Sequence, residues 1–228
     1  MAAFCSVNGL AVLEGAVTLP RLGVWNADLS IDAYAAQRGK ATITIGAQTL
    51  IGTFTRNGRD VMGRLRARIV GGAAGLATVL QPRSYGSIPL KVPLSDALRD
   101  AGEVLSAAAD TSLLATQLTA WSRLAAPASS VVASLLQAVP NAVWRVLVDG
   151  TVWCGFESWP AATLRDVFAM HSEPEKGRVT IASIAPSVLP GTTLQFSVPG
   201  QGAQAVRVGG VHHIIRATEV RTVVLTES

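Results

Sequence analysis

The chain has few charged side chains and only two cysteines. Charged residues make up 15% of its 228 residues, against about 25% in a typical soluble domain. Much of the chain is therefore expected to be shielded from water, either inside its own fold or by neighbouring subunits. Cys5 and Cys154 are too few for a disulfide framework or a cysteine-only zinc site. Both are expected to be buried as small apolar residues.

Lysine is nearly absent, with three lysines beside sixteen arginines, and the net charge is +4. This excess is modest for a nucleic-acid-binding protein. Arginine tolerates protein interfaces better than lysine because its planar fork binds carboxylates and carbonyls. The bias fits an assembling protein, and it fits a GC-rich genome equally well.

No segment indicates export or membrane insertion. The N-terminal MAAFCSVNGLAVLEG has no Lys or Arg before its apolar part, unlike a secretory signal, so the protein is expected in the cytoplasm where it is made. The uncharged residues 124–144 contain Pro127, Pro140 and several polar residues. They predict a buried connector rather than a membrane span.

Catalytic and cofactor motifs are also missing. Gly71, Gly72 and Gly75 do not have the G-x-G-x-x-G spacing, and no Gly-Lys-Ser/Thr follows them. His212 and His213 are adjacent in a strand pattern, which points them to opposite faces and prevents them from serving one metal. No catalytic residue, cofactor or metal site is therefore predicted.

Short alternating segments dominate what is present. Five of them precede residue 82, with a turn expected at Asn57-Gly58: residues 11–19, 22–31, 41–45, 49–55 and 61–70. Three helices follow, at residues 96–102 after a Ser95 cap, 111–124 and 129–139. A second β region contains residues 178–184, 192–198, 205–217 and 220–226.

This order predicts a mainly β protein with a small helical insertion. Two β-barrel-like units are expected, joined by short helices. The expected domains are residues 1–82 for the first unit, 83–140 for the helical connector and 141–228 for the second unit.

An arginine stripe is the first candidate interaction surface. Arg64, Arg66 and Arg68 alternate with apolar residues, so a pleated strand places all three guanidinium groups on one face. No aromatic residues interleave with them as base-stacking platforms would. A solvated or inter-subunit face that pairs with acids is therefore favoured over a phosphate-binding stripe.

The stretch VWRVLVDGTVWCGFESWP, residues 143–160, holds three of the five tryptophans. Asp149-Gly150 predicts a two-residue type I′ turn, which pairs Trp144 with Gly155 and makes both faces of the hairpin largely apolar. Trp144 and Trp153 are then expected to be buried, with Gly155 beside Trp144. Only Trp159 is expected to be exposed, as an interface candidate.

Four segments together resemble tailed-phage baseplate hub and hub-like tail proteins of the late control protein D type. They are VPLSDALRDAGE (92–103), WRVLVDGTVWCG (144–155), PSVLPGTTL (186–194) and VRVGGVHHIIRATEVRTVVL (206–225). The chain is shorter than a typical full hub. The faint similarity between TITIGAQTLIGTF (42–54) and RVLVDGTVWCGF (145–156) fits a hub built from two similar β units.

The resemblance implies a structural virion protein rather than an enzyme. It implies a homotrimer that continues the tail tube, lines the channel for DNA as passing cargo and anchors a spike, with tail tube, spike, tape measure and baseplate wedge proteins as partners. The protein would then be assembled in the host cytoplasm and reside in the virion tail.

Two other functions stay open. A carbohydrate- or receptor-binding tail module would expose Tyr85, Trp153 and Trp159 as platforms. A cell-wall hydrolase of the tail tip would place Glu157 near a second carboxylate such as Asp149.

Overall fold

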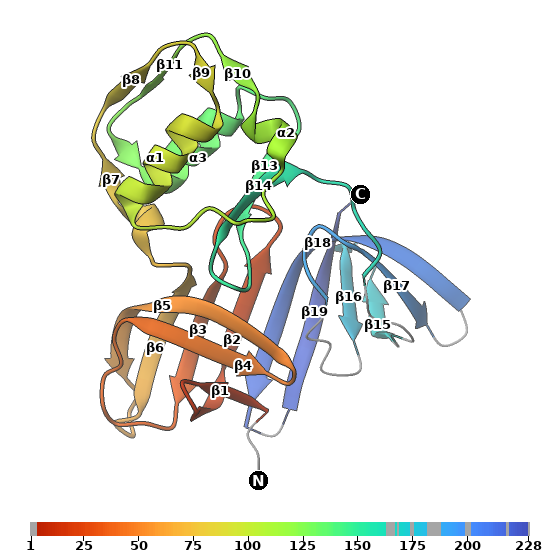
Figure 1. Ribbon diagram of the computed structural model, residues 1–228. Helices are drawn as coiled ribbons and strands as arrows, with labels where there is room; N and C mark the ends of the chain where they lie inside the picture. The colour runs from red at the N-terminus through yellow and green to blue at the C-terminus, as the bar shows by residue number, and fades with distance from the viewer. Residues whose placement is uncertain are drawn as a thin grey trace.

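The computed structural model describes residues 4–162, 167, 169–173, 176–181, 188–198, 202–217 and 219–227. It has three parts, as Figure 1 shows: a β-barrel, a small helical layer above it, and a second sheet beside it. Within the described residues, no helix is both long enough and apolar enough to pass through a membrane.

The first six strands close into a barrel, in the order β1-β4-β5-β6-β3-β2, with β1 pairing again with β2. These strands are β1 (Cys5–Val7), β2 (Leu10–Pro20), β3 (Asn26–Ile31), β4 (Lys40–Ile45), β5 (Gln48–Arg59) and β6 (Leu65–Gly71). Their alternating sequences place Ile43, Leu29 and Ile69 in the buried core, as the period of two dictates. The predicted N-terminal β unit is therefore a closed barrel.

The turn between β5 and β6 is centred on residues 61–62, four residues beyond its expected place. Asn57 and Gly58 continue β5 and pair with Ala67 and Arg66, so the prediction of a turn at Asn57-Gly58 was wrong. The chain reverses after Asp60 instead, whose carboxylate Oδ1 accepts hydrogen bonds from the backbone N–H groups of Met62 and Arg64, both at 2.8 Å. An aspartate that binds its own following amides initiates a turn, and here it prevails over the Asn-Gly pair.

The C-terminal strands form a curled sheet that is hydrogen-bonded to the barrel. They are β15 (Ala169–Glu173), β16 (Arg178–Ile181), β17 (Thr193–Val198), β18 (Gly202–Arg216) and β19 (Glu219–Glu227). Strand β18 pairs with β2 from Gly210↔Pro20 to Arg216↔Glu14, so both β regions share one continuous sheet. The two edges of the curled sheet, β15 and β17, approach each other, which gives this part a barrel-like form.

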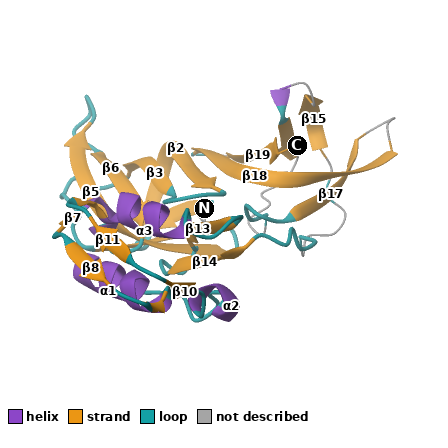
Figure 2. Ribbon diagram, turned by 90° about the horizontal axis from the view of Figure 1, so that it is seen from above, coloured by secondary structure: helices purple, strands orange, loops and turns teal. Residues whose placement is uncertain are grey.

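The helical layer contains three helices and three two-stranded ladders. The helices are α1 (Lys91–Ala101), α2 (Thr111–Leu114) and α3 (Ala128–Leu136), preceded by the 3-10 turn η1 (Gly75–Ala77). The ladders pair β7 (Val79–Leu80) with β12 (Ala126–Pro127), β8 (Arg83–Tyr85) with β11 (Trp121–Arg123), and β9 (Ile88–Pro89) with β10 (Gln117–Leu118). Helices α1 and α3 lie against each other, as both views show (Figures 1 and 2).

Two helix predictions in this layer were wrong in their extent. Ser95 lies inside α1 and does not cap it, because the helix already begins at Lys91; Pro93 is tolerated there since the first turn needs no backbone N–H from it. The segment expected as a helix over 111–124 is helical only over 111–114. Beyond that point Arg123 is buried and donates to Asp100 and to the carbonyl of Gln81, contacts that the strand conformation supplies.

Trp25 connects the barrel to the hairpin that follows the helical layer. Its side chain is 1% exposed, and its ring lies so close to Gly52 and Gly71 that a Cβ atom at either position would lie 2.8 Å or less from the ring. Its indole Nε1 donates to the carbonyl oxygen of Leu147 at 3.1 Å. Two glycines thus make room for a tryptophan that anchors the hairpin to the barrel.

Candidate functional site

The hairpin of β13 (Ala142–Val146) and β14 (Val152–Phe156) ends in a three-residue loop. The backbone N–H of Gly150 donates to the carbonyl of Leu147, and Gly150 has a φ of 82°. The carboxylate of Asp149 accepts from both the N–H and the hydroxyl of Thr151, at 2.9 and 2.7 Å. This is a type I turn followed by a left-handed glycine, so the predicted two-residue type I′ turn was wrong.

Because the loop is one residue longer than predicted, the pairing between β13 and β14 is shifted by one residue from the predicted register. Trp144 pairs with Cys154 and Arg145 with Trp153, and since directly paired residues share a face, Trp144 and Trp153 lie on opposite faces. Gly155 lies beside Trp153 instead of Trp144. The two are so close that a Cβ atom on Gly155 would be 2.7 Å from Cζ2 of Trp153. Both tryptophans are partly buried, and Trp144 packs against the core, so most of each ring is covered, as expected, although neither is fully enclosed.

The hairpin forms its own two-stranded sheet, between the helical layer and the barrel (Figure 1). It is therefore not the first element of the C-terminal sheet, as the sequence interpretation had it. The backbone N–H of Ile51 donates to the carbonyl of Val148 at 2.7 Å, which holds the hairpin tip against β5.

An ion-pair chain links the hairpin to the barrel and to the C-terminal sheet. Glu157, whose side chain is 7% exposed, accepts from Arg145 at 2.5 Å and from Arg21 at 2.8 Å. Arg21 in turn pairs with Glu227 at 2.6 Å. Arg145 also lies over the ring of Trp153, 4.4 Å from its centroid. Charge-assisted hydrogen bonds from Arg145 and Arg21 to Glu157, together with the Arg21–Glu227 ion pair, therefore join three parts of the molecule.

None of these ion pairs was predicted, although the sequence contains a signal for one of them. Arg145 and Glu157 are two of the few charged residues in the apolar stretch 142–160, and charges in a covered hairpin are expected to pair. Arg21 and Glu227 had no such signal, because they lie far away along the chain.

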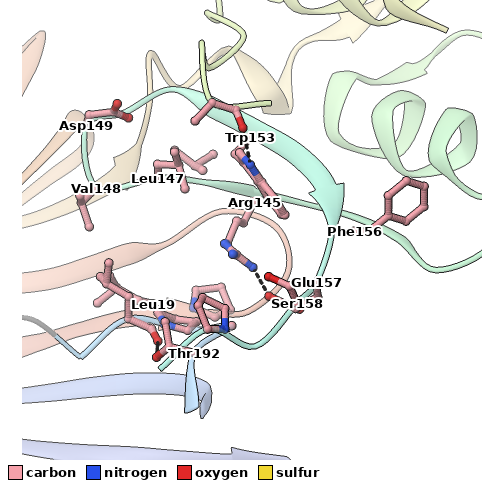
Figure 3. Close-up of a pocket in the computed structure, with 17 residues that line it drawn as sticks. Leu19, Arg145, Leu147, Val148, Asp149, Trp153, Phe156, Glu157, Ser158 and Thr192 are labelled. Atoms are coloured by element: carbon pink, nitrogen blue, oxygen red, sulfur yellow. Dashed lines mark hydrogen bonds and ion pairs between the residues drawn. The ribbon is translucent and has the colours of Figure 1, made fainter. Parts of the chain in front are cut away.

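A pocket of about 380 Å³ lies beside the cluster, between β2, the hairpin and the segment 189–192 (Figure 3). Its apolar walls include Leu19, Pro20, Val148, Trp153, Leu189 and Pro190. Glu157 and Arg145 neutralise each other at one side, and Gly191 (φ 82°) passes so close to Glu157 that a side chain there would collide with it. The pocket is thus an apolar recess with an internally paired polar wall.

The candidate carbohydrate platforms lie in two parts of the molecule: Tyr85 is in the helical layer, and Trp153 and Trp159 lie against arginines of the ion-pair chain. Trp159 is half-buried, against the prediction that it is exposed, and its ring lies near the guanidinium groups of Arg21 and Arg207, at 5.7 and 5.3 Å from the centroid. Tyr85 lies in the helical layer, with its ring centroid 5.8 Å from that of Trp121. Each of these aromatic side chains, like Trp153, has its own set of protein neighbours.

The carboxylates proposed for a hydrolase are engaged in the structure. Both oxygens of Glu157 accept from arginines, and Oδ1 of Asp149 is used within its own turn. Their roles are explained by the fold.

The arginine stripe has the predicted alternation over β6. Arg66 and Arg68 are exposed while Leu65, Ala67 and Ile69 are buried. They lie 3.4 Å from Glu14 and 3.5 Å from Asp28, in exposed ion pairs that contribute little to stability. Arg64 precedes the strand and belongs to the β5–β6 turn. Whether this surface is an interface stays a prediction.

The two adjacent histidines point to opposite faces of β18, as the strand pattern predicts. Imidazole Nδ1 of His212 lies 2.8 Å from the hydroxyl of Thr18. His213 is fully buried, and its Nδ1 lies 2.9 Å from the hydroxyl of Thr222. Burial lowers the pKa of His213 to about 4, with a further contribution from His212.

Both cysteines are buried free thiols, as expected. Burial raises the pKa of Cys5 to about 12 and that of Cys154 to about 11, so both are inert at neutral pH. Across the described part of the chain, His, Cys, Asp and Glu side chains do not gather in groups of three or more that would hold a metal ion.

Comparisons with known proteins find similarity only at the level of structure. No protein-family model matches the sequence, and no curated protein matches it significantly. A solved structure with the same fold is the 43 kDa tail protein of prophage MuSo2 from Shewanella oneidensis: the TM-score is 0.71 at 9% identity, covering 98% of this chain and 96% of that one.

Prophage tail protein gp18 from Listeria monocytogenes is a weaker structural match, with a TM-score of 0.45 and 10% identity over 92% of this chain and 87% of that one. That score is too low to support an argument about the fold.

Proposed function

We propose that the protein is a structural component of a phage tail, of the baseplate hub or hub-like kind. The observation that supports this most is the fold, which matches a prophage tail protein over 98% of the chain. The match covers the barrel, the helical layer and the curled sheet together, so the shared feature is the whole arrangement. At 9% identity the similarity carries the fold alone, and the tail role is our inference from it.

The form of the molecule fits an assembly role. A closed barrel and a curled sheet share one continuous sheet through β2 and β18, so the two β lobes form one hydrogen-bonded unit. Three such units in a ring present six lobes around a channel.

In this proposal the protein acts mechanically. Its barrels continue the tail tube, surround the path of the DNA and carry a spike, with tube, spike, tape measure and wedge proteins as neighbours. The low charged fraction of 15% is consistent with a surface that is largely covered in the particle.

The test is to determine the mass of the purified protein by native mass spectrometry and to locate it in tail particles by immunogold electron microscopy. The proposal predicts a homotrimer and a label at the baseplate end of the tail. A monomer at all concentrations tested that is absent from tail particles would overturn it.

A further inference from the structure

The turn between β5 and β6 presents two apolar side chains to water. Val61 is 104% exposed and Met62 68% exposed. The turn itself is well formed, because Asp60 binds the amides of Met62 and Arg64 and its carbonyl accepts from Gly63. A structured turn that displays two such side chains offers apolar area for burial against another surface.

Positively charged side chains surround this tip. Arg59 and Arg64 flank it, and Arg56 lies on the same strand as Arg59. The only acid within the turn, Asp60, uses Oδ1 for the backbone of the turn. A complementary surface is therefore expected to be apolar in its centre and acidic at its margin.

The pocket beside the hairpin is apolar in its centre and has an acidic residue at its margin. Its walls are apolar, and its volume of about 380 Å³ holds roughly a dozen water molecules, which leaves room for the side chains of Val61 and Met62. At its margin lies the exposed Asp149, which has no cationic side chain as an ion-pair partner among the described residues. The arginine on the pocket wall, Arg145, is already neutralised by Glu157.

The Val61–Met62 tip lies too far from the hairpin pocket of its own chain to fill it. The hairpin that forms the pocket is held to Ile51, near the start of β5, whereas the tip follows Arg59 at the end of the same strand. Eight residues of strand separate them, which is about 26 Å at roughly 3.3 Å per residue. The two surfaces therefore face different neighbours.

We propose that the Val61–Met62 tip of one copy inserts into the hairpin pocket of the next copy, in a head-to-tail contact. Two different patches on one chain generate a ring when the rotation between copies closes. The inference rests on the proposed ring-forming tail function, and it adds which surfaces meet.

Disulfide trapping tests the contact directly. The double variant Val61→Cys/Ser158→Cys places one thiol at the tip and one on the exposed, pocket-lining Ser158. Both native cysteines are buried, so they do not compete. Mild oxidation of the full-length protein should give covalent dimers and higher multimers on non-reducing gels, while either single variant stays monomeric.

Charge insertion tests the energetic contribution. Val61→Glu/Met62→Glu should weaken self-association on the order of a hundredfold, because the burial of two apolar side chains is lost and new carboxylates face Asp149. The matched control is Leu124→Glu, at a residue 75% exposed in the helical layer, and it should assemble like the wild type. Circular dichroism and thermal melting verify that each variant is folded.

The outcomes separate this inference from the proposed function. Trapped multimers from the double variant together with weakened assembly of the charged variant support it. An assembled wild type whose charged variant assembles equally well would overturn the contact and leave the tail function standing. Trapping by Val61→Cys alone would overturn it too, since that result means that two tips meet. A wild type that never assembles contradicts both.

Discussion

Acidification between pH 6.5 and 4 should destabilise the protein through one buried histidine. His213 is fully buried on β18, its Nδ1 is paired with Thr222, and its Nε2 has no hydrogen-bond partner among the described residues. Protonation would leave a positive charge in this apolar site, which is why burial lowers the pKa.

The size and sign of the effect follow from proton linkage. The folded-state pKa is about 4 and the unperturbed value is 6.5, so between these values the unfolded chain binds a proton that the folded chain does not. Stability is therefore fully present above pH 6.5, falls as the pH decreases through this window, and has no further loss from this residue below about pH 4. The pKa difference corresponds to about 3 kcal/mol.

Urea unfolding at a series of pH values from 7.5 to about 4 measures this loss. Wild type and His213→Leu are compared, because carboxylates that titrate in both proteins cancel in the difference. The variant should lack the loss of about 3 kcal/mol, whereas a variant of the exposed His171, His171→Gln, should keep it. Parallel curves for wild type and His213→Leu would refute the reasoning.

Two further stability changes follow from the ion-pair chain and from the loop after β6. Glu157→Gln should lower the free energy of unfolding by about 3 kcal/mol, because it removes a carboxylate that is 7% exposed and bound by two arginines. The control Glu219→Gln, at an exposed carboxylate, should change the free energy of unfolding by less than about 0.5 kcal/mol. Equal stability of the two variants would show that the Glu157 ion pairs do not stabilise the fold. Glu103→Gln should lower the free energy of unfolding by about 1–3 kcal/mol, because the two carboxylate oxygens of Glu103 accept from the backbone amides of Ala73 and Gly75. Hydrogen exchange at these two amides should become faster in the variant. Unchanged exchange there would show that the carboxylate does not hold the loop.

Alternation along the chain predicted most of the β-structure correctly. Residues 41–45 and 49–55 lie in β4 and β5, and the expected strand 205–217 lies in β18 as far as Arg216. The burial of alternate residues in β6 also follows the sequence pattern. These are local properties, since a strand with one face in the core needs apolar residues at every second position. Of the strand expected at 178–184, residues 178–181 form β16, and residues 182–184 lie outside the described residues.

Predictions that depended on a choice between competing local contacts were the ones that failed. The turn at Asp149-Gly150 uses the Asp149 carboxylate to bind Thr151. This adds one residue to the loop and places Trp144 and Trp153 on opposite faces of the hairpin. The expected helix over 111–124 gives way to short strands because Arg123 finds Asp100. In both cases contacts made in the folded protein override the local sequence preference.

The amino-acid sequence by itself determined a mainly β protein with a helical insertion, the buried faces of its strands and the inert character of its cysteines, because these depend on residue type and on periodicity. Only the tertiary structure decided the closure of the barrel, the shared sheet of β2 and β18, and the meeting of Arg21, Arg145, Glu157 and Glu227 beside an apolar pocket. The reason is distance along the chain: Arg21 and Glu157 are 136 residues apart, and no local pattern records which distant side chains a folded sheet brings within hydrogen-bonding distance.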